Sequence, residues 1–160
     1  MIYVVQTIPA GEDKACFKAQ RAGITAWVPK RELTLRKGGE WIRAVDILFP
    51  GYVFIECDYC PKVHYAVTAI PEVLRFLGEP TPITGAEEDF MRVMFNGGYP
   101  LSESKAVINS DGTIRITEGW LKGREDYIKD ICIRRRRAYI EIAFGGRTHR
   151  TSVGAEFTNA

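Results

Sequence analysis

The stretch DICIRRRRAYIEIAF, from Asp130 to Phe144, decides how the last third of the chain folds. Strand-forming residues lie on both sides of four consecutive arginines, at the place where a hairpin normally turns on Gly, Asn or Asp. Like charges repel one another and add nothing to a core, so we expect a partner outside the chain to bind them. Strand alternation predicts five inward-facing side chains: Ile131, Ile133, Ile140, Ile142 and Phe144.

Short strands separated by Gly-containing turns surround this hairpin. We expect strands at TIRIT (113–117), DYIKDICI (126–133), AYIEIAF (138–144) and RTHRTSVG (147–154). The region carries no helix signal, so the pattern predicts a small β-barrel.

The first part of the chain mixes helices and strands. Strands are expected at 2–7, 26–35, 40–57 and 73–78, with a turn at Lys37-Gly38-Gly39. Helices are expected at 11–23, 62–70 and 84–98, the last capped by Thr84. The elements lack a regular βαβ rhythm, so we expect an α+β fold with a mixed α/β sandwich in this part.

A polar segment rich in Gly, Ser and Asn, residues 96–112, has the composition of a linker. The sequence therefore predicts an N-terminal domain over 1–98, a linker over 99–108 and a C-terminal domain over 109–160.

The composition is that of a soluble globular protein, with 46% hydrophobic and 26% charged residues among 160. No apolar run is long enough to cross a membrane, and the N-terminus lacks the features of a signal peptide, so we expect a cytoplasmic protein. Residues 1–108 carry a net charge of −1 and residues 109–160 a net charge of +3. This asymmetry indicates a nucleic-acid-binding face on the C-terminal part.

The four cysteines, Cys16, Cys57, Cys60 and Cys132, are scattered and are expected to be reduced. Cys57, Cys60 and His64 form only part of a zinc ligand set, so no metal or other cofactor is expected. The chain has no phosphate-binding loop and no nucleophile motif, so we do not expect an enzyme.

Four blocks resemble the N-terminal domain of the NusG family of transcription elongation factors: YVVQT, GEDKA, FPGYVFI (49–55) and IPEVLRFLG (70–78). The last third is similar to that family's KOW domain. The resemblance implies a mixed α/β N-terminal domain followed by a KOW domain, an SH3-like β-barrel, and it implies a monomer.

The resemblance also implies that the N-terminal domain binds the clamp helices of RNA polymerase. Phe49 and Tyr52 match family positions on the polymerase-binding surface, and Ile2 stands where the family usually has an aromatic residue. FPGY is expected to expose an aromatic side chain on each side of a Pro-Gly turn, where such residues act as interface anchors. The alternative is that Phe49 and Tyr52 are ordinary core residues.

The C-terminal part departs from the housekeeping pattern, because Trp120 stands in place of a proline, Arg124 falls near a missing aromatic, and Asp126 replaces a glycine. These changes are similar to the LoaP group of processive antiterminators, which bind a hairpin in the leader RNA through the KOW domain. The predicted RNA-binding residues are Lys122, Arg124, Lys129, Arg134, Arg135, Arg136 and Arg137.

Guanidinium groups bind phosphates in a bidentate manner and stack on bases, and Trp120 or Tyr139 is expected to lie beside the basic tip. The alternative is a solvated turn whose charges only keep the protein in solution.

A second basic feature is the set Lys14, Lys18 and Arg21, which share one face of the first helix. Family resemblance suggests contact with non-template DNA, and a solvated helix face is the alternative. The tip RKGGEWIR (36–43), with Trp41 exposed, is a further candidate for contact with polymerase or nucleic acid.

Two other functions stay open. One is a general elongation factor whose KOW domain binds a ribosomal protein or the termination factor Rho, an interpretation that the retained Phe144 favours. The other is a DNA-recognising paralogue similar to the RfaH branch.

Overall fold

The computed structural model describes residues 1–160, and the chain divides into two compact units. Unit 1 comprises Met1–Pro29, Phe49–Gly98 and Ala143–Thr148, and unit 2 comprises Lys30–Leu48, Tyr99–Ile142 and His149–Ala160. Each unit is therefore discontinuous in sequence. One junction follows residue 98, where the sequence places the end of the N-terminal domain. That residues 1–98 and 109–160 form separate domains stays a prediction.

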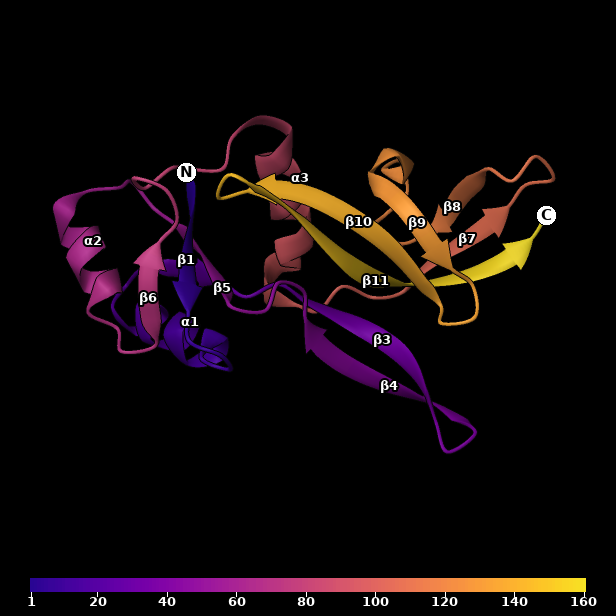
Figure 1. Ribbon diagram of the computed structural model, residues 1–160, viewed down its shortest axis with the longest axis horizontal. Helices are drawn as coiled ribbons and strands as arrows, with labels where there is room; N and C mark the ends of the chain where they lie inside the picture. The colour runs from indigo at the N-terminus through magenta and orange to yellow at the C-terminus, as the bar shows by residue number, and fades with distance from the viewer. The chain divides into compact units, whose positions relative to one another are not determined.

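Unit 1 is built on a four-stranded antiparallel sheet in the order β2-β5-β1-β6 (Figure 1). Its strands are β1 (Ile2–Thr7), β2 (Thr25–Trp27), β5 (Tyr52–Glu56) and β6 (Val73–Phe76). β1 pairs on both edges, with β5 and β6, and its first four residues are all buried.

Three helices accompany this sheet: α1 (Glu12–Arg21), α2 (Pro61–Thr68) and α3 (Gly85–Phe95). Thr84 stands at the N-cap position of α3 with extended backbone, as predicted, although its side chain makes no capping hydrogen bond. Asn96, in the left-handed conformation with φ of 48°, ends α3 and begins a short 3-10 turn, Asn96–Gly98. No helix is long and apolar enough to span a bilayer.

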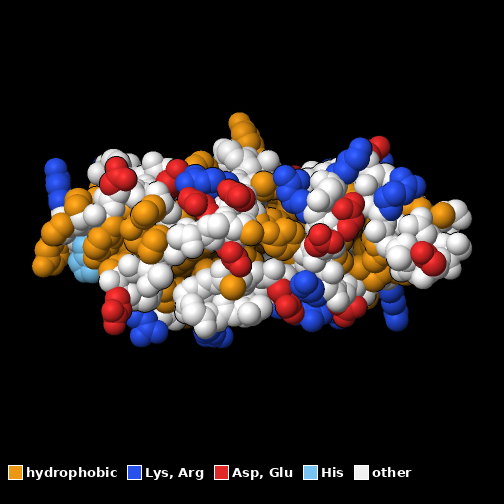
Figure 2. Space-filling model, turned by 90° about the horizontal axis from the view of Figure 1, so that it is seen from above, with side chains coloured by type: hydrophobic (Ala, Val, Ile, Leu, Met, Phe, Trp, Pro, Cys, Tyr) orange, Lys and Arg blue, Asp and Glu red, His pale blue; other side chains and the backbone are white.

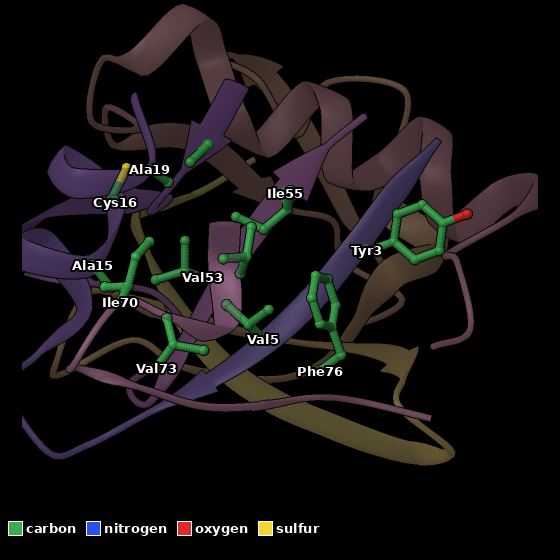
Figure 3. Packing of buried hydrophobic residues seen from close by; sticks show 12 residues of the cluster. Tyr3, Val5, Ala15, Cys16, Ala19, Val53, Ile55, Ile70, Val73 and Phe76 are labelled. Carbon is green, nitrogen blue, oxygen red and sulfur yellow. The ribbon is translucent and has the colours of Figure 1, made fainter. Parts of the chain in front are cut away.

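The core of unit 1 follows from strand alternation. Tyr3, Val5, Val53 and Ile55 point to one face, where they pack with Ala15, Cys16 and Ala19 of α1 and with Val67 of α2 (Figure 3). Phe54 points to the opposite face, where its ring centroid lies 5.7 Å from that of Phe95 in α3. Helices therefore cover both faces, and the predicted mixed α/β arrangement is confirmed.

Exposed apolar side chains gather near α2 (Figure 2). Tyr65 of α2 and Leu74 of β6 are both exposed. His64, also on α2, stacks on Phe76 at 5.3 Å, and its Nδ1 lies 2.5 Å from the hydroxyl of Tyr59. No group of three or more His, Cys, Asp and Glu side chains in the chain is arranged to hold a metal ion. His64 packs as an aromatic side chain.

Unit 2 contains the hairpin of β3 (Lys30–Lys37) and β4 (Glu40–Ile47). Lys37 pairs with Glu40, so the turn consists of Gly38 and Gly39, which both have positive φ, 60° and 82°. Such a turn matches the twist of two antiparallel strands, and the hairpin predicted at this place is confirmed.

A five-stranded sheet in the order β8-β7-β11-β10-β9 makes up most of the C-terminal region. Its strands are β7 (Ser104–Ile108), β8 (Ile114–Glu118), β9 (Ile128–Cys132), β10 (Arg137–Phe144) and β11 (Arg147–Asn159), and a 3-10 turn, Glu125–Tyr127, precedes β9. The predicted C-terminal β structure is confirmed. β8 and β9 are the edge strands of this order, so closure into a KOW barrel stays a prediction.

Several details differ from the expectations. The stretches expected as single strands at 26–35 and 40–57 each divide into two strands, β2 and β3 in the first and β4 and β5 in the second, and the two halves belong to different sheets. Residues 104–108, expected within a linker, form β7, because Ser104 and Ala106 are small side chains buried between β8 and β11. β11 continues past Gly154, where a side chain would meet the carbonyl of Glu32 at 2.8 Å. Ile133, expected inside, is 53% exposed, because β9 ends at Cys132 and Ile133 enters the turn.

The close approach of Gly119 to Ser104 can be tested by substitution. Its φ is 106°, and a Cβ there would lie 2.8 Å from the Cα of Ser104. Gly119→Ala is expected to lower the free energy of unfolding by about 2–4 kcal/mol, since backbone strain and overpacking add. Gly112→Ala is the matched control, because Gly112 also has positive φ, 85°, but has open space around it. The control should lose only about 1–2 kcal/mol. Equal losses in urea denaturation would contradict the contribution of the Ser104 contact.

Candidate nucleic-acid interface

The four arginines lie where β9 turns into β10. The turn occupies residues 133–136 and is closed by a hydrogen bond from Arg136 N to Ile133 O of 3.1 Å. Arg134 and Arg135 are exposed, as predicted. Arg136 is half-buried and has a φ of 55°.

Arg137 is a correction to the expectation of four arginines at an exposed tip. It is the first residue of β10, is half-buried, and donates from Nη1 to Ser152 Oγ at 3.1 Å. The turn begins one residue earlier than the alternation pattern suggested, since Ile133 belongs to it. Arg137 therefore has a structural partner that Arg134 and Arg135 lack among the hydrogen bonds observed.

The β3–β4 hairpin brings an aromatic residue to this turn. Arg36 and Trp41 are directly opposite each other in the hairpin, and the guanidinium carbon of Arg36 lies 5.3 Å from the Trp41 ring centroid. The guanidinium carbon of Arg136 lies closer to the same ring, at 4.2 Å. Trp41 is thus in cation–π contact with one arginine from each segment.

Together these segments line a groove of about 790 Å³, which we name the arginine groove. Its charged and aromatic lining residues are Arg36, Lys37, Trp41, Arg134, Arg135 and Arg137, and Thr34, Leu35 and Ile42 complete it. None of the lining residues is acidic. Positive charges that line a concave surface raise the local concentration of anionic ligands, so the groove is suited to phosphates.

A polar network holds the hairpin beside β11. Arg31 of β3 donates from Nη1 to Thr151 Oγ1 at 2.8 Å and to the carbonyl and hydroxyl oxygens of Ser152. Asp46 accepts from Nη2 of Arg31 at 3.4 Å. Burial lowers the pKa of Arg31 below its ordinary value, Asp46 opposes that shift, and the nearby charge of Arg137 adds to it. The hydroxyl of Ser152 accepts hydrogen bonds from both Arg31 and Arg137, so it links the β3–β4 hairpin to the start of β10.

The other predicted RNA-binding residues do not line the groove. Lys122 and Lys129 are exposed, and Lys129 donates to Asp126 O at 3.2 Å. Arg124 is half-buried and donates to Trp120 O at 2.8 Å, which stabilises the turn after β8. Neither expected stacking residue is at the groove: Trp120 is in the turn after β8, and Tyr139 lies under Arg150 at 5.0 Å. Trp41 is the aromatic residue there.

The basic face of α1 contains one paired charge. Lys18 forms an ion pair with Glu72, with Nζ 2.9 Å from Oε2. Lys14 and Arg21 are exposed, and Arg21 lies 5.8 Å above the ring of Phe17. The three residues share a face, as predicted, but Lys18 is less available to a ligand than the pattern suggested.

The predicted polymerase-binding residues lie in unit 1 and are largely buried. Ile2 is fully buried and Phe49 is 4% exposed, so the expectation that FPGY exposes an aromatic on each side is wrong for Phe49. Tyr52 is half-buried. The ring of Phe144, the last residue of β10, lies 5.4 Å from that of Phe49 and 5.3 Å from that of Tyr52. The expected Pro-Gly turn is present, because Gly51 has a φ of 89° and Tyr52 N donates to Phe49 O at 3.3 Å. Gly51 N donates to Glu12 Oε2 at 2.9 Å.

Sequence reasoning missed two of these juxtapositions. The tip of residues 36–43 was a separate candidate, but nothing in the sequence placed Trp41 under Arg136. Phe144 is buried, as strand alternation predicted, but nothing in the sequence indicated that it packs on Phe49 and Tyr52. Both contacts join residues about 95 positions apart, so local pattern carries no signal of them.

Comparison with known proteins agrees with this architecture. The family model described as "Transcription termination factor nusG" matches residues 2–92. The protein "Transcription termination/antitermination protein NusG" of Helicobacter pylori is 28% identical over 105 residues, which are 63% of this chain but only 58% of that protein. Its namesake in Buchnera aphidicola is 24% identical over 127 residues, 76% of this chain and 69% of the relative.

A solved structure titled "Domain interaction in Thermotoga maritima NusG" has a similar fold. Its TM-score is 0.53 with 24% identity, covering 96% of this chain and 92% of the other. The family model spans more than half of the residues, and the chain therefore belongs to the NusG family of transcription termination and antitermination factors.

Proposed function

We propose that this chain is a transcription elongation factor that acts as a processive antiterminator, like the LoaP group of its family. In this proposal Ile2, Phe49 and Tyr52 belong to the surface that binds the clamp helices of RNA polymerase. The arginine turn and the groove beside it bind an RNA hairpin in the nascent leader. The observation that carries the RNA step is the arginine groove, with five cationic side chains, one tryptophan and no acid.

RNA suits this groove for three reasons. Guanidinium groups bind phosphate oxygens through paired hydrogen bonds and also stack on bases. Arg134 and Arg135 are exposed, so phosphates reach them without loss of internal contacts. A hairpin presents closely spaced phosphates and unpaired loop bases, which proteins recognise by shape and stacking. Lys122 and Lys129 lie outside the groove and would add only long-range attraction to a bound hairpin.

The proposed mechanism is one of effective concentration. Capture of a hairpin on nascent RNA holds the factor near the polymerase that made that RNA, and this favours binding at the clamp. The bound factor then travels with polymerase past terminators. Readthrough in a terminator reporter should therefore depend on the leader hairpin, and readthrough that persists after the hairpin is deleted would contradict the RNA step.

Phe144 affects the proposed binding to polymerase, because it covers residues assigned to that surface. Its ring is 4% exposed and packs on Phe49, Tyr52 and Phe54 within unit 1. If polymerase binds through Phe49 and Tyr52, the segment Ala143–Thr148 must leave them first. The fraction of molecules in which it has left then sets the apparent affinity for polymerase.

Two alternatives are tested by the same variants. If the C-terminal part binds a protein instead of RNA, it would do so through Phe144. The side chain of Phe144 is buried here against the rings of Phe49 and Tyr52. A DNA-recognising paralogue would use Lys14, Lys18 and Arg21, of which Lys18 is paired with Glu72. The arginine groove has no role in either alternative.

Replacement of Arg134 and Arg135 by Ser should weaken binding to an RNA stem-loop and flatten its salt dependence. The slope of log K against log salt is expected to fall by roughly 1.4–1.8 for two lost phosphate contacts. The matched control, Lys14→Ser with Arg21→Ser, removes two exposed charges from α1 and should leave the RNA slope unchanged. Salt titrations of the full chain measure both. A larger effect of the α1 variant, or equal effects, would contradict the assignment of RNA to the arginine turn.

Phe144→Ser should strengthen binding to RNA polymerase, because the side chain that covers Phe49 and Tyr52 loses its apolar contacts. A change of roughly tenfold corresponds to about 1.4 kcal/mol of lost packing. Arg147→Ser is the control, since Arg147 begins β11 on the other side of the same turn and is exposed. Affinity is measured with core polymerase, and circular dichroism verifies that the variant is folded. Unchanged or weaker binding by the folded variant would show that Phe144 does not cover the polymerase-binding surface.

A further inference from the structure

Trp41 lies outside the buried hydrophobic core of the chain. It is on β4, six of whose eight residues are exposed, and is itself 38% exposed. The hydrophobic side chains of the C-terminal sheet, such as Ile140 and Ile142, form a buried set without it. An exposed indole on a two-stranded hairpin is therefore available to a ligand.

The contacts of Trp41 are weak and replaceable. Arg136 lies 4.2 Å from the ring centroid and Arg36 lies 5.3 Å from it. Cation–π contacts at exposed sites are weaker than the stacking of a nucleobase on an aromatic ring. A base can therefore take the place of one guanidinium on the indole, or be held between the indole and that guanidinium.

The backbone of Arg136 is held by two hydrogen bonds that do not involve its side chain. Arg136 N donates to Ile133 O, and Arg136 O accepts from Ala155 N at 3.0 Å. The turn thus stays in position when the guanidinium leaves the indole. The aromatic surface and the arginines beside it are preorganised, which reduces the entropic cost of binding.

The size and charge of the groove indicate what fits beside the indole. A volume of about 790 Å³ is within the range of small-ligand sites, roughly 300–1,000 Å³. Arg36, Lys37, Arg134 and Arg135 line it and supply the charge for flanking phosphates. A base inside a duplex is stacked on its neighbours and cannot cover the indole, whereas an unpaired base can.

We infer that Trp41 is the base-stacking residue of the arginine groove, so that the groove binds an unpaired nucleotide of an RNA loop and discriminates loops from duplex. The inference rests on the proposed binding of RNA and adds the β3–β4 hairpin to the RNA site. Arg134 and Arg135 supply affinity for any phosphate backbone, and Trp41 supplies the preference for unpaired bases.

The test compares two RNA probes of equal phosphate number, a stem closed by an unpaired loop and a blunt duplex. Trp41→Ala in the full chain should weaken binding to the stem-loop by roughly 5- to 100-fold, as expected for one stacked base. Binding to the duplex should change by less than about twofold, and Trp41→Phe should restore most of the loop preference, because a phenyl ring also stacks. The chain has three tryptophans, and quenching by the stem-loop should be lost in the Trp41 variants alone, with Trp120→Phe as control.

The outcomes separate the two proposals. Equal weakening on both probes, or no weakening on either, would overturn the stacking role while RNA binding stands. Loss of loop preference that Trp41→Phe fails to restore would likewise overturn it. If the unaltered chain binds neither probe, the proposed RNA function fails and the stacking role fails with it.

Discussion

The candidate interface depends on the half-buried guanidinium of Arg31. This side chain crosses from β3 to β11, where Thr151 and Ser152 accept its hydrogen bonds. A cation removed from water must be paired or hydrogen-bonded, and burial together with the neighbouring Arg137 makes that requirement stricter here. Because Ser152 accepts from both arginines, the hairpin and the strand after the arginine turn share one anchor.

The charge of the groove is a local property. The chain as a whole carries only +2, yet five cationic side chains and no acid line this one concavity. Arginines that stand so close to one another are unfavourable unless an anion separates them or an aromatic face receives them. The ring of Trp41 is in cation–π contact with the guanidinium groups of Arg36 and Arg136. In the proposed complex, phosphates of RNA would neutralise the charges of Arg134 and Arg135.

The strand β10 carries a residue for each proposed step. Its first residue, Arg137, lines the groove, and its last, Phe144, packs on the rings of Phe49 and Tyr52. Family resemblance assigns Phe49 and Tyr52 to polymerase, and their burial beside Phe144 adds a condition to that assignment, because the ring that covers them must move away. This condition is what the Phe144 variant measures.

Local pattern determined most of the secondary structure. Alternation and turn residues indicated where the helices, the Gly38-Gly39 hairpin and most strands lie, since these depend on neighbours in sequence, but they did not show that residues 26–35 and 40–57 each divide into two strands. Local pattern failed at Ile133, where the end of β9 sets the start of the turn, and at residues 104–108, where strand pairing on both sides buries Ser104. The basic turn and the exposed Trp41 were each visible as separate features of the sequence. Only the tertiary structure decided that Trp41 contacts Arg136 and that Phe49 packs against Phe144. Contacts between residues that are distant in sequence follow from strand pairing and packing, not from local composition.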